Sequence, residues 1–234
     1  MSSSPEASKV FGRLTEQAHQ VLDLGRDEAE RIGHRYLGPE HLLLGMLHEH
    51  ASGAAWLLRA HGVGLAAARA ELLVLAERGV VPAARPSDRE LLGTLGVDLA
   101  EVRRSIEQAF GATALGEATW RVTRRRGWRG AGVVWTPLCG PPFLAKRALQ
   151  LAGERASALG HDEIGPEHVL LGVVEDAREL AGSPRGSRRH RRIIAHVGLP
   201  DGYQGAVGPL LAALGVDLEA LRRAVLVALR GGGS

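Results

Sequence analysis

The chain has 234 residues, of which 45% are apolar and 24% are charged, a composition typical of a globular protein with one large domain or two smaller ones. Its formal net charge is only +3, and no apolar run approaches the roughly 18 residues of a membrane-spanning helix. The single cysteine excludes an internal disulfide and a cysteine-cluster metal site, and residues 1–9 contain no secretory signal. We therefore expect a disordered N-terminus over 1–9 and a cytoplasmic location.

The first predicted helix covers residues 15–32, where apolar residues recur at spacings of three and four and form one stripe. Thr15 is placed to cap its N-terminus. A loop over 33–38 follows, and Pro39 then occupies the first position of a second helix, where its missing N–H costs nothing. Glu40 faces the positive end of that helix dipole.

The chain repeats itself. The block over 33–45, which reads Gly-His-Arg-Tyr-Leu-Gly-Pro-Glu-His-Leu-Leu-Leu-Gly, recurs at 160–172. A second element at 91–99 reappears at 210–218, and a looser copy lies at 57–65. Two ordered elements that occur twice indicate two homologous halves.

The predicted halves cover 10–110 and 138–230, joined by a linker over 111–137 that is rich in Arg and Gly. A basic loop over 178–207 is inserted in the second half, and 231–234 form a flexible tail. Asp98 with Glu101, and Asp217 in the second half, are typical helix starts. No alternating run predicts a sheet, so the predicted fold class is all-α.

Three motifs together resemble the Clp N-terminal repeat, the substrate- and adaptor-binding domain of ClpC-type unfoldases. They are Phe-Gly-Arg-Leu-Thr-Glu-Gln-Ala at 11–18, the duplicated Gly-Pro-Glu-His block, and the Leu-Gly-Val-Asp-Leu helix starts. The resemblance implies two pseudo-repeats of four helices each in one bundle. The chain departs from the family where Pro39 and Pro166 replace Thr, and where Pro142 takes the place that corresponds to Thr15.

Enzymatic chemistry is not predicted. Neither Lys9 nor Lys146 lies in a Gly-x-x-x-x-Gly-Lys-[Ser/Thr] loop, so we expect a free-standing N-domain without ATPase modules. No Gly-x-Ser-x-Gly elbow and no His-Glu-x-x-His motif occurs, so no catalytic residue, metal or cofactor is expected. His41 and His168 recur on core-facing helices, which favours a structural role over a ligand role.

The resemblance implies a ligand role for the two glutamates after the Gly-Pro turns. In ClpC-like domains the residues equivalent to Glu40 and Glu167 engage the guanidinium of a phosphoarginine degradation tag, a bidentate charge-assisted contact. The alternative is that both glutamates only stabilise their helix dipoles. Thr15 could provide a hydroxyl for the phosphate and Pro142 could not, so we expect binding near Glu40 and Thr15.

The family also captures cyclic peptide antibiotics on an apolar surface near the first helix, where this chain has Phe11 and Arg13. The alternative for Phe11 is that it fastens that helix to the core. Two Arg clusters, at 121–129 and 185–192, support a different hypothesis, namely binding of nucleic acid or another polyanion. An aromatic content of 4% and the lack of a reader motif weigh against it.

The sequence thus predicts a non-enzymatic protein- or peptide-binding module of the Clp proteolysis system. Its expected partners are Clp-system proteins, tagged substrates or cyclic peptides, with nucleic acid as the alternative and no membrane. We expect it to act as an adaptor or as a decoy that sequesters ligands.

Overall fold

The structure is a computed structural model that describes residues 10, 12–34, 36–48, 52–81, 101, 104–105, 108–109, 143–181 and 203–231. The prediction of an all-α fold is confirmed, because the only β-structure in these ranges is one isolated bridge. The named helices are α2 (Glu16–Ile32), α3 (Pro39–His48), α4 (Gly53–Ala60), α5 (Leu65–Glu77), α9 (Phe143–Ala158), α10 (Pro166–Ala181), α12 (Val207–Ala213) and α13 (Leu218–Gly231).

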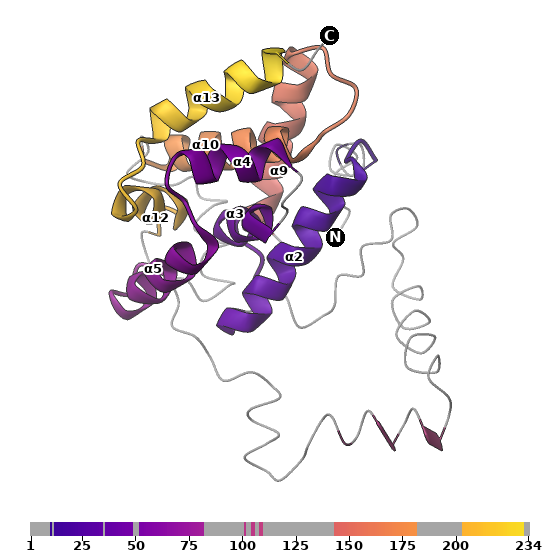
Figure 1. The fold of residues 1–234 in the computed structure, drawn as a ribbon, viewed down its shortest axis with the longest axis vertical. Coiled ribbons are helices and arrows are strands. Elements are labelled where there is room, and N and C mark those ends of the chain that lie inside the picture. The colour runs from indigo at the N-terminus through magenta and orange to yellow at the C-terminus, as the bar shows by residue number, and fades with distance from the viewer. Residues whose placement is uncertain are drawn as a thin grey trace.

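The predicted duplication is present as two sets of four helices. We call α2, α3, α4 and α5 the first repeat, and α9, α10, α12 and α13 the second repeat (Figure 1). Gly33 and Gly160 end α2 and α9 with φ values of 77° and 78°, and Gly62 and Gly215 adopt φ values of 82° and 74° after α4 and α12. The segment 57–65, the looser of the sequence copies, is therefore the structural counterpart of 210–218.

The predicted domain boundaries fall on residues that the structure does not describe. The linker 111–137, the whole element at 91–99 and most of the basic loop 178–207 lie outside the described ranges and stay predictions. The first four residues of that predicted loop are helical, because α10 continues to Ala181. The backbone at Glu101, Arg104, Ser105, Gln108 and Ala109 is helical, as the start at Asp98 predicts.

Helix α2 forms as its sequence predicts. Thr15 is its N-cap, and the Thr15 hydroxyl accepts a hydrogen bond of 3.2 Å from the Ala18 N–H. Gly33 adopts a left-handed conformation that residues with a Cβ rarely take, and it ends the helix. The apolar stripe of α2 is buried and its other face is exposed.

The core runs continuously through both repeats, with α3 and α10 at its centre (Figure 1). Every residue of α3 from Pro39 to Leu47 is buried, as expected of a helix that is apolar all round. In α10, the side chains of Leu170 and Leu171 are fully buried. None of the described helices is long and apolar enough to cross a membrane.

Glycines let the paired helices approach each other closely. A Cβ on Gly45 of α3 would lie 2.7 Å from the Gly25 nitrogen of α2, and a Cβ on Gly172 of α10 would lie 2.8 Å from the Ala152 nitrogen of α9. Real Cβ atoms do not come this close to backbone. The helix pairs α2–α3 and α9–α10 therefore depend on the absence of a side chain at Gly45 and Gly172.

Backbone hydrogen bonds tie the two repeats together at both ends. The Thr15 N–H donates to the Ile164 carbonyl at 3.1 Å, and the Ile164 N–H donates to the Arg13 carbonyl at 2.7 Å. At the equivalent place in the first repeat, the Ala145 N–H donates to the Leu37 carbonyl at 3.2 Å. The segment before α2 and the first turn of α9 thus each lie against the loop before the Gly-Pro-Glu turn of the other repeat.

Candidate functional site

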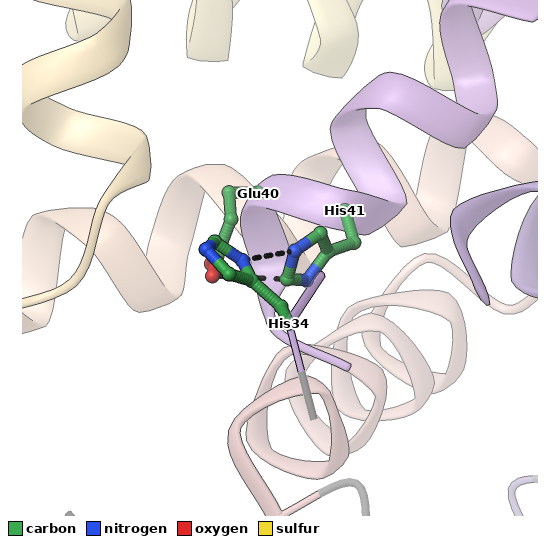
Figure 2. A group of neighbouring side chains, drawn as sticks. All are labelled: His34, Glu40 and His41. Atoms are coloured by element: carbon green, nitrogen blue, oxygen red, sulfur yellow. Dashed lines mark hydrogen bonds and ion pairs between the residues drawn. The ribbon is translucent and has the colours of Figure 1, made fainter. Parts of the chain in front are cut away.

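A pair of histidines braces each Gly-Pro-Glu turn. In the first repeat, His34 Nδ1 and His41 Nε2 are 2.9 Å apart (Figure 2). The Gly38 N–H donates to His41 Nδ1 at 2.9 Å. The second repeat has the same arrangement, with 2.8 Å between His161 and His168 and 3.1 Å from the Gly165 nitrogen to His168 Nδ1. These histidines hold the backbone of the turn.

The hydrogen bonds of each histidine pair, which we call the brace, fix the protonation state of the buried histidines. His41 Nδ1 accepts from a backbone N–H, so His41 must carry its proton on Nε2 and donate it to His34. Burial and the neighbouring His34 hold the pKa of His41 well below its usual value. Burial, followed by His161 and Arg13, lowers the pKa of His168 to about 4. Both imidazoles are therefore neutral at physiological pH.

His34, Glu40 and His41 come close enough together to suggest a metal site (Figure 2). The hydrogen bonds argue against it. The Nδ1 lone pair of His41 accepts from Gly38, and the Nδ1 lone pair of His34 accepts from His41. A metal on either atom would have to break the brace, so we assign this cluster a structural role.

Glu40 is fully buried at the start of α3. Its carboxylate folds back against Gly38, where a Cβ would collide with it. Neither carboxylate oxygen accepts a hydrogen bond of normal geometry from the described residues. Burial raises the pKa of Glu40 to about 7, the nearby Tyr36 hydroxyl opposes that rise, and the charge of Asp176 adds to it.

Glu167 occupies the equivalent position in the second repeat but has a different environment. It is half-buried, and its Oε1 accepts a hydrogen bond of 3.1 Å from the Ala54 N–H at the N-terminus of α4. The carboxylate can approach α4 because Gly53 has no side chain; a Cβ there would lie 2.6 Å from Oε1. The other oxygen, Oε2, has no hydrogen-bond partner among the described residues.

Thr15 lies beside the second of these turns. Its N–H bonds to Ile164, three residues before Glu167. The structure does not bring Thr15 and Glu40 together, because they lie near opposite ends of α2, a 17-residue helix about 25 Å long. Of the predicted ligand residues, Thr15 and Glu167 therefore belong to one region and Glu40 to another.

Arg13 also lies in the region of Thr15 and Glu167, and its guanidinium clamps the end of α9. It donates to the carbonyl of Asp162 at 2.7 Å, to the carbonyl of His161 at 2.7 Å and to the Ser157 hydroxyl at 2.8 Å. A cation is favourable at the C-terminal end of a helix. Phe11, the other residue of the predicted peptide-binding surface, lies outside the described residues.

Sequence reasoning missed two buried acids that hold the helices of each repeat together. Glu28 of α2 is fully buried, and Arg69 donates to both of its oxygens, while His48 lies 2.7 Å from Oε1. Burial alone would raise the pKa of Glu28, but Arg69 and His48 hold it below its usual value. The signal was present, because Glu28 falls among the core-facing residues of its helix.

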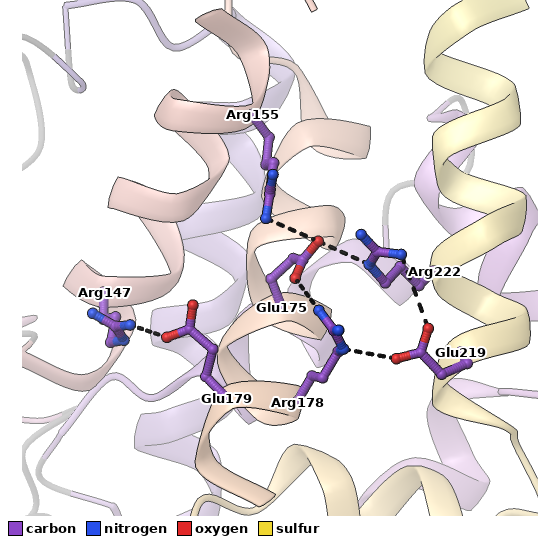
Figure 3. Close-up of polar contacts among 7 residues, drawn as sticks. All are labelled: Arg147, Arg155, Glu175, Arg178, Glu179, Glu219 and Arg222. Atoms are coloured by element: carbon purple, nitrogen blue, oxygen red, sulfur yellow. Dashed lines mark hydrogen bonds and ion pairs between the residues drawn. The ribbon is translucent and has the colours of Figure 1, made fainter. Parts of the chain in front are cut away.

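Glu175 of α10 has the same role in the second repeat. Arg222 donates to it at 2.8 Å, and Arg155 and Arg178 lie 3.4 and 3.3 Å away (Figure 3). Burial opposes ionisation, yet these cations keep the pKa of Glu175 below its usual value. Both acids are therefore charged and structural rather than available to a ligand.

Comparison with known proteins agrees with this architecture. The model of the Clp repeat (R) N-terminal domain matches residues 13–88. The chain is 30% identical over 174 residues to the ClpA homolog of Guillardia theta and to chloroplastic ClpC of Pisum sativum, and 25% identical over 232 residues to ClpB of Oceanobacillus iheyensis. This chain carries a Clp repeat N-terminal domain.

The likeness to Clp proteins extends through both halves of the chain. The crystal structure of the N-terminal domain of ClpD from Arabidopsis thaliana superposes with a TM-score of 0.50 at 19% identity, covering 94% of this chain and 97% of that domain. The three curated relatives are aligned over 74%, 74% and 95% of this chain, which spans only 15%, 13% and 22% of their lengths. The likeness is thus to the N-domain, the substrate- and adaptor-binding module of Clp chaperones.

Proposed function

We propose that this Clp repeat domain binds arginine-bearing protein segments, of the phosphoarginine type, at the Gly-Pro-Glu turn of its second repeat. The observation that carries the proposal is the state of Glu167. One carboxylate oxygen is held in place by the α4 N-terminus, and the other has no partner among the described residues. A fixed carboxylate with an available oxygen suits a guanidinium, which binds carboxylates through paired N–H groups.

The neighbouring residues suit the phosphate of such a ligand. Thr15 brings a half-buried hydroxyl to the loop that leads into Glu167, and Arg13 brings a guanidinium that its three hydrogen bonds hold in position. A fixed positive charge and a hydroxyl are appropriate partners for a phosphoryl group. The carboxylate would thus select the guanidinium, and Arg13 with Thr15 would favour its phosphorylated form.

Glu40 is not included in the proposed site, because it is fully buried and its carboxylate is turned back onto Gly38. The two turns therefore differ in access, and we expect one ligand per chain. In this proposal the domain delivers tagged proteins to a Clp unfoldase as an adaptor, or withholds them as a decoy. A pulldown that recovers an unfoldase together with tagged protein supports delivery, and recovery of tagged protein alone supports sequestration.

Two other expected ligands gain nothing from the described residues. The Arg clusters proposed to bind polyanions lie in undescribed parts of the chain, as does Phe11 of the cyclic-peptide surface. Both ideas stay predictions, as does the cytoplasmic location.

Isothermal titration calorimetry with free phosphoarginine tests the proposed site. We expect one site per chain in the wild type, loss of binding in Glu167→Ala, and retained binding in Glu40→Gln. Ser52→Ala is the matched control, because it weakens the same end of α4 but leaves the carboxylate in place. Absence of heat in the wild type, or binding lost in Glu40→Gln and kept in Glu167→Ala, contradicts the proposal.

A further inference from the structure

Four buried ionisable side chains meet where the two repeats face each other. Tyr36 and Glu40 come from the first repeat, and Asp176 and Tyr203 come from the second. All four are at most 6% exposed. Each acts on the ionisation of others in the group: Asp176 on Glu40, Glu40 on Tyr36, and both acids on Tyr203. We call this group the interface cluster.

The interface cluster contains little to offset a negative charge. Glu40 Oε1 lies 3.7 Å from His41 Nδ1, but His41 is neutral and is hydrogen-bonded to a neutral His34. On the side of Asp176, Arg147 of α9 approaches Oδ1 to 3.3 Å, and the charge of Glu179, on α10 like Asp176 itself, opposes the effect of Arg147. Arg147 is the one cation recorded against the cluster in the described part of the chain, and it is half-exposed.

The other two buried glutamates, Glu28 and Glu175, have cations beside them that balance their negative charge. Glu28 accepts two hydrogen bonds from Arg69, and Glu175 is surrounded by three arginines. Within the described ranges, Glu40 has no charged cation against it and accepts no hydrogen bond of normal geometry. A carboxyl group so placed is tolerated far better with a proton, because a proton removes the charge and adds a donor.

We propose that the interface cluster is a proton-dependent lock between the two repeats. With its proton in place, Glu40 is neutral and the repeats pack tightly around it. Loss of the proton puts a negative charge beside Asp176 in an apolar interface and loosens the contact between the repeats. This inference concerns the coupling of the repeats and is independent of the ligand proposed for Glu167.

The direction of the pH dependence follows from burial. Burial raises the pKa of both Glu40 and Asp176 to about 7, from usual values of 4.5 and 3.8. The folded protein therefore keeps protons that the unfolded chain releases, and the stabilisation is complete below about pH 4. The stabilisation is lost as the pH rises to about 7. Because Glu40 and Asp176 interact, this loss is a property of the two acids together and is not divided between them.

Chemical denaturation at a series of pH values from 5 to 8.5 tests the lock. For the wild type we expect the unfolding equilibrium constant to rise about 100-fold across the series. Glu40→Gln should remove most of that rise, because the amide is neutral at every pH. Glu167→Gln is the matched control at the equivalent position, and it should keep the full rise. Asp176→Asn should flatten the profile as well, and it replaces Glu40→Gln if the latter does not fold.

Two results would overturn the lock. The first is an equal pH dependence in the wild type, Glu40→Gln and Asp176→Asn. The second is a higher unfolding midpoint on adding Zn²⁺ in the wild type but not in Glu40→Gln, which would make Glu40 a metal ligand instead. Hydrogen exchange at the Ala145 and Ile164 amides, which bridge the repeats, separates the lock from general stability. Opening of these amides should increase with pH in the wild type and not in Glu40→Gln.

Discussion

The two Gly-Pro-Glu turns of this chain have the same backbone and different chemistry. Each is held by a histidine pair and by a glycine N–H bonded to the second histidine. The glutamate that follows is sealed inside the fold at Glu40, but at Glu167 it reaches across to the other repeat. A duplicated motif can thus keep the same turn in both copies while its glutamate has a different environment and role in each.

The buried acids give a second comparison. Arg69 and Arg222 occupy matching positions in α5 and α13, and each binds a buried glutamate. That glutamate comes from α2 in the first repeat, as Glu28, and from α10 in the second, as Glu175. When Gly33 is aligned with Gly160, Arg155 stands at the position of Glu28. The repeats therefore preserve an ion pair at one place while exchanging which helix supplies the acid.

The largest effects are expected where the repeats agree most closely. Gly45→Ala and Gly172→Ala each place a methyl group against the backbone of the neighbouring helix, which must move away. We expect each to lower the free energy of unfolding by about 3 kcal/mol, the upper part of the range for overpacking. Thermal or urea unfolding measures it.

Gly208→Ala in α12 is the matched control for these two variants. A Cβ on Gly208 meets nothing within 4 Å apart from its chain neighbours. The helix propensity that alanine adds is offset by its crowding against the ring of Pro209, so we expect the free energy of unfolding to change by no more than about 0.5 kcal/mol. If Gly45→Ala or Gly172→Ala behaves like Gly208→Ala, the helix pairs are not held at the separation described above.

Local features of this fold could be predicted from the sequence, and long-range ones could not. The Thr15 cap and the helix start at Pro39 depend on neighbouring residues, and both are confirmed. The pairing of Thr15 with Glu40 ignored the length of the helix between them. Each residue instead lies against the other repeat, which no spacing within one half can reveal.

The strength of a sequence match does not by itself decide which segments correspond. The element at 91–99 resembles 210–218 more closely than 57–65 does and lies outside the described residues, whereas α4 and α5 hold the places of α12 and α13 in the order of the described helices. Three-dimensional equivalence is set here by the order of helices in the core rather than by identity of residues. Glu28 shows a related limit, because its place on the buried face was visible but its partner Arg69 was not.

The next effect in size comes from the exchanged acids. Glu28→Ala and Glu175→Ala each leave partly buried arginines without their carboxylate, and we expect each to cost about 2 kcal/mol. Because the pKa of both acids is lowered on folding, their contribution is present above about pH 4.5 and is lost as the pH falls below it.

This acid-side loss is opposite in direction to the effect expected for Glu40. Urea unfolding between pH 3 and pH 7 measures it, and each variant should lose the acid-side slope that its own residue contributes. Equal costs would support the equivalence of the two ion pairs. If only one of the two variants lowers the free energy of unfolding, the ion pair in the other repeat does not contribute to stability.

The smallest effects concern the N-terminus of α4, where the two repeats share one helix end. Ser52 accepts from the Ala55 N–H at 3.1 Å, and Glu167 of the other repeat accepts from the Ala54 N–H at the same distance. Ser52→Ala and Glu167→Ala should each cost about 1 kcal/mol, the usual value of a lost cap. Glu163→Ala removes an exposed acid from the loop that leads into Glu167, and it should not change the free energy of unfolding measurably. Urea unfolding at low and high salt completes the comparison: a hydrogen-bonded cap resists screening by salt, whereas a loss in Glu167→Ala that disappears at 1 M NaCl would show that only its charge mattered.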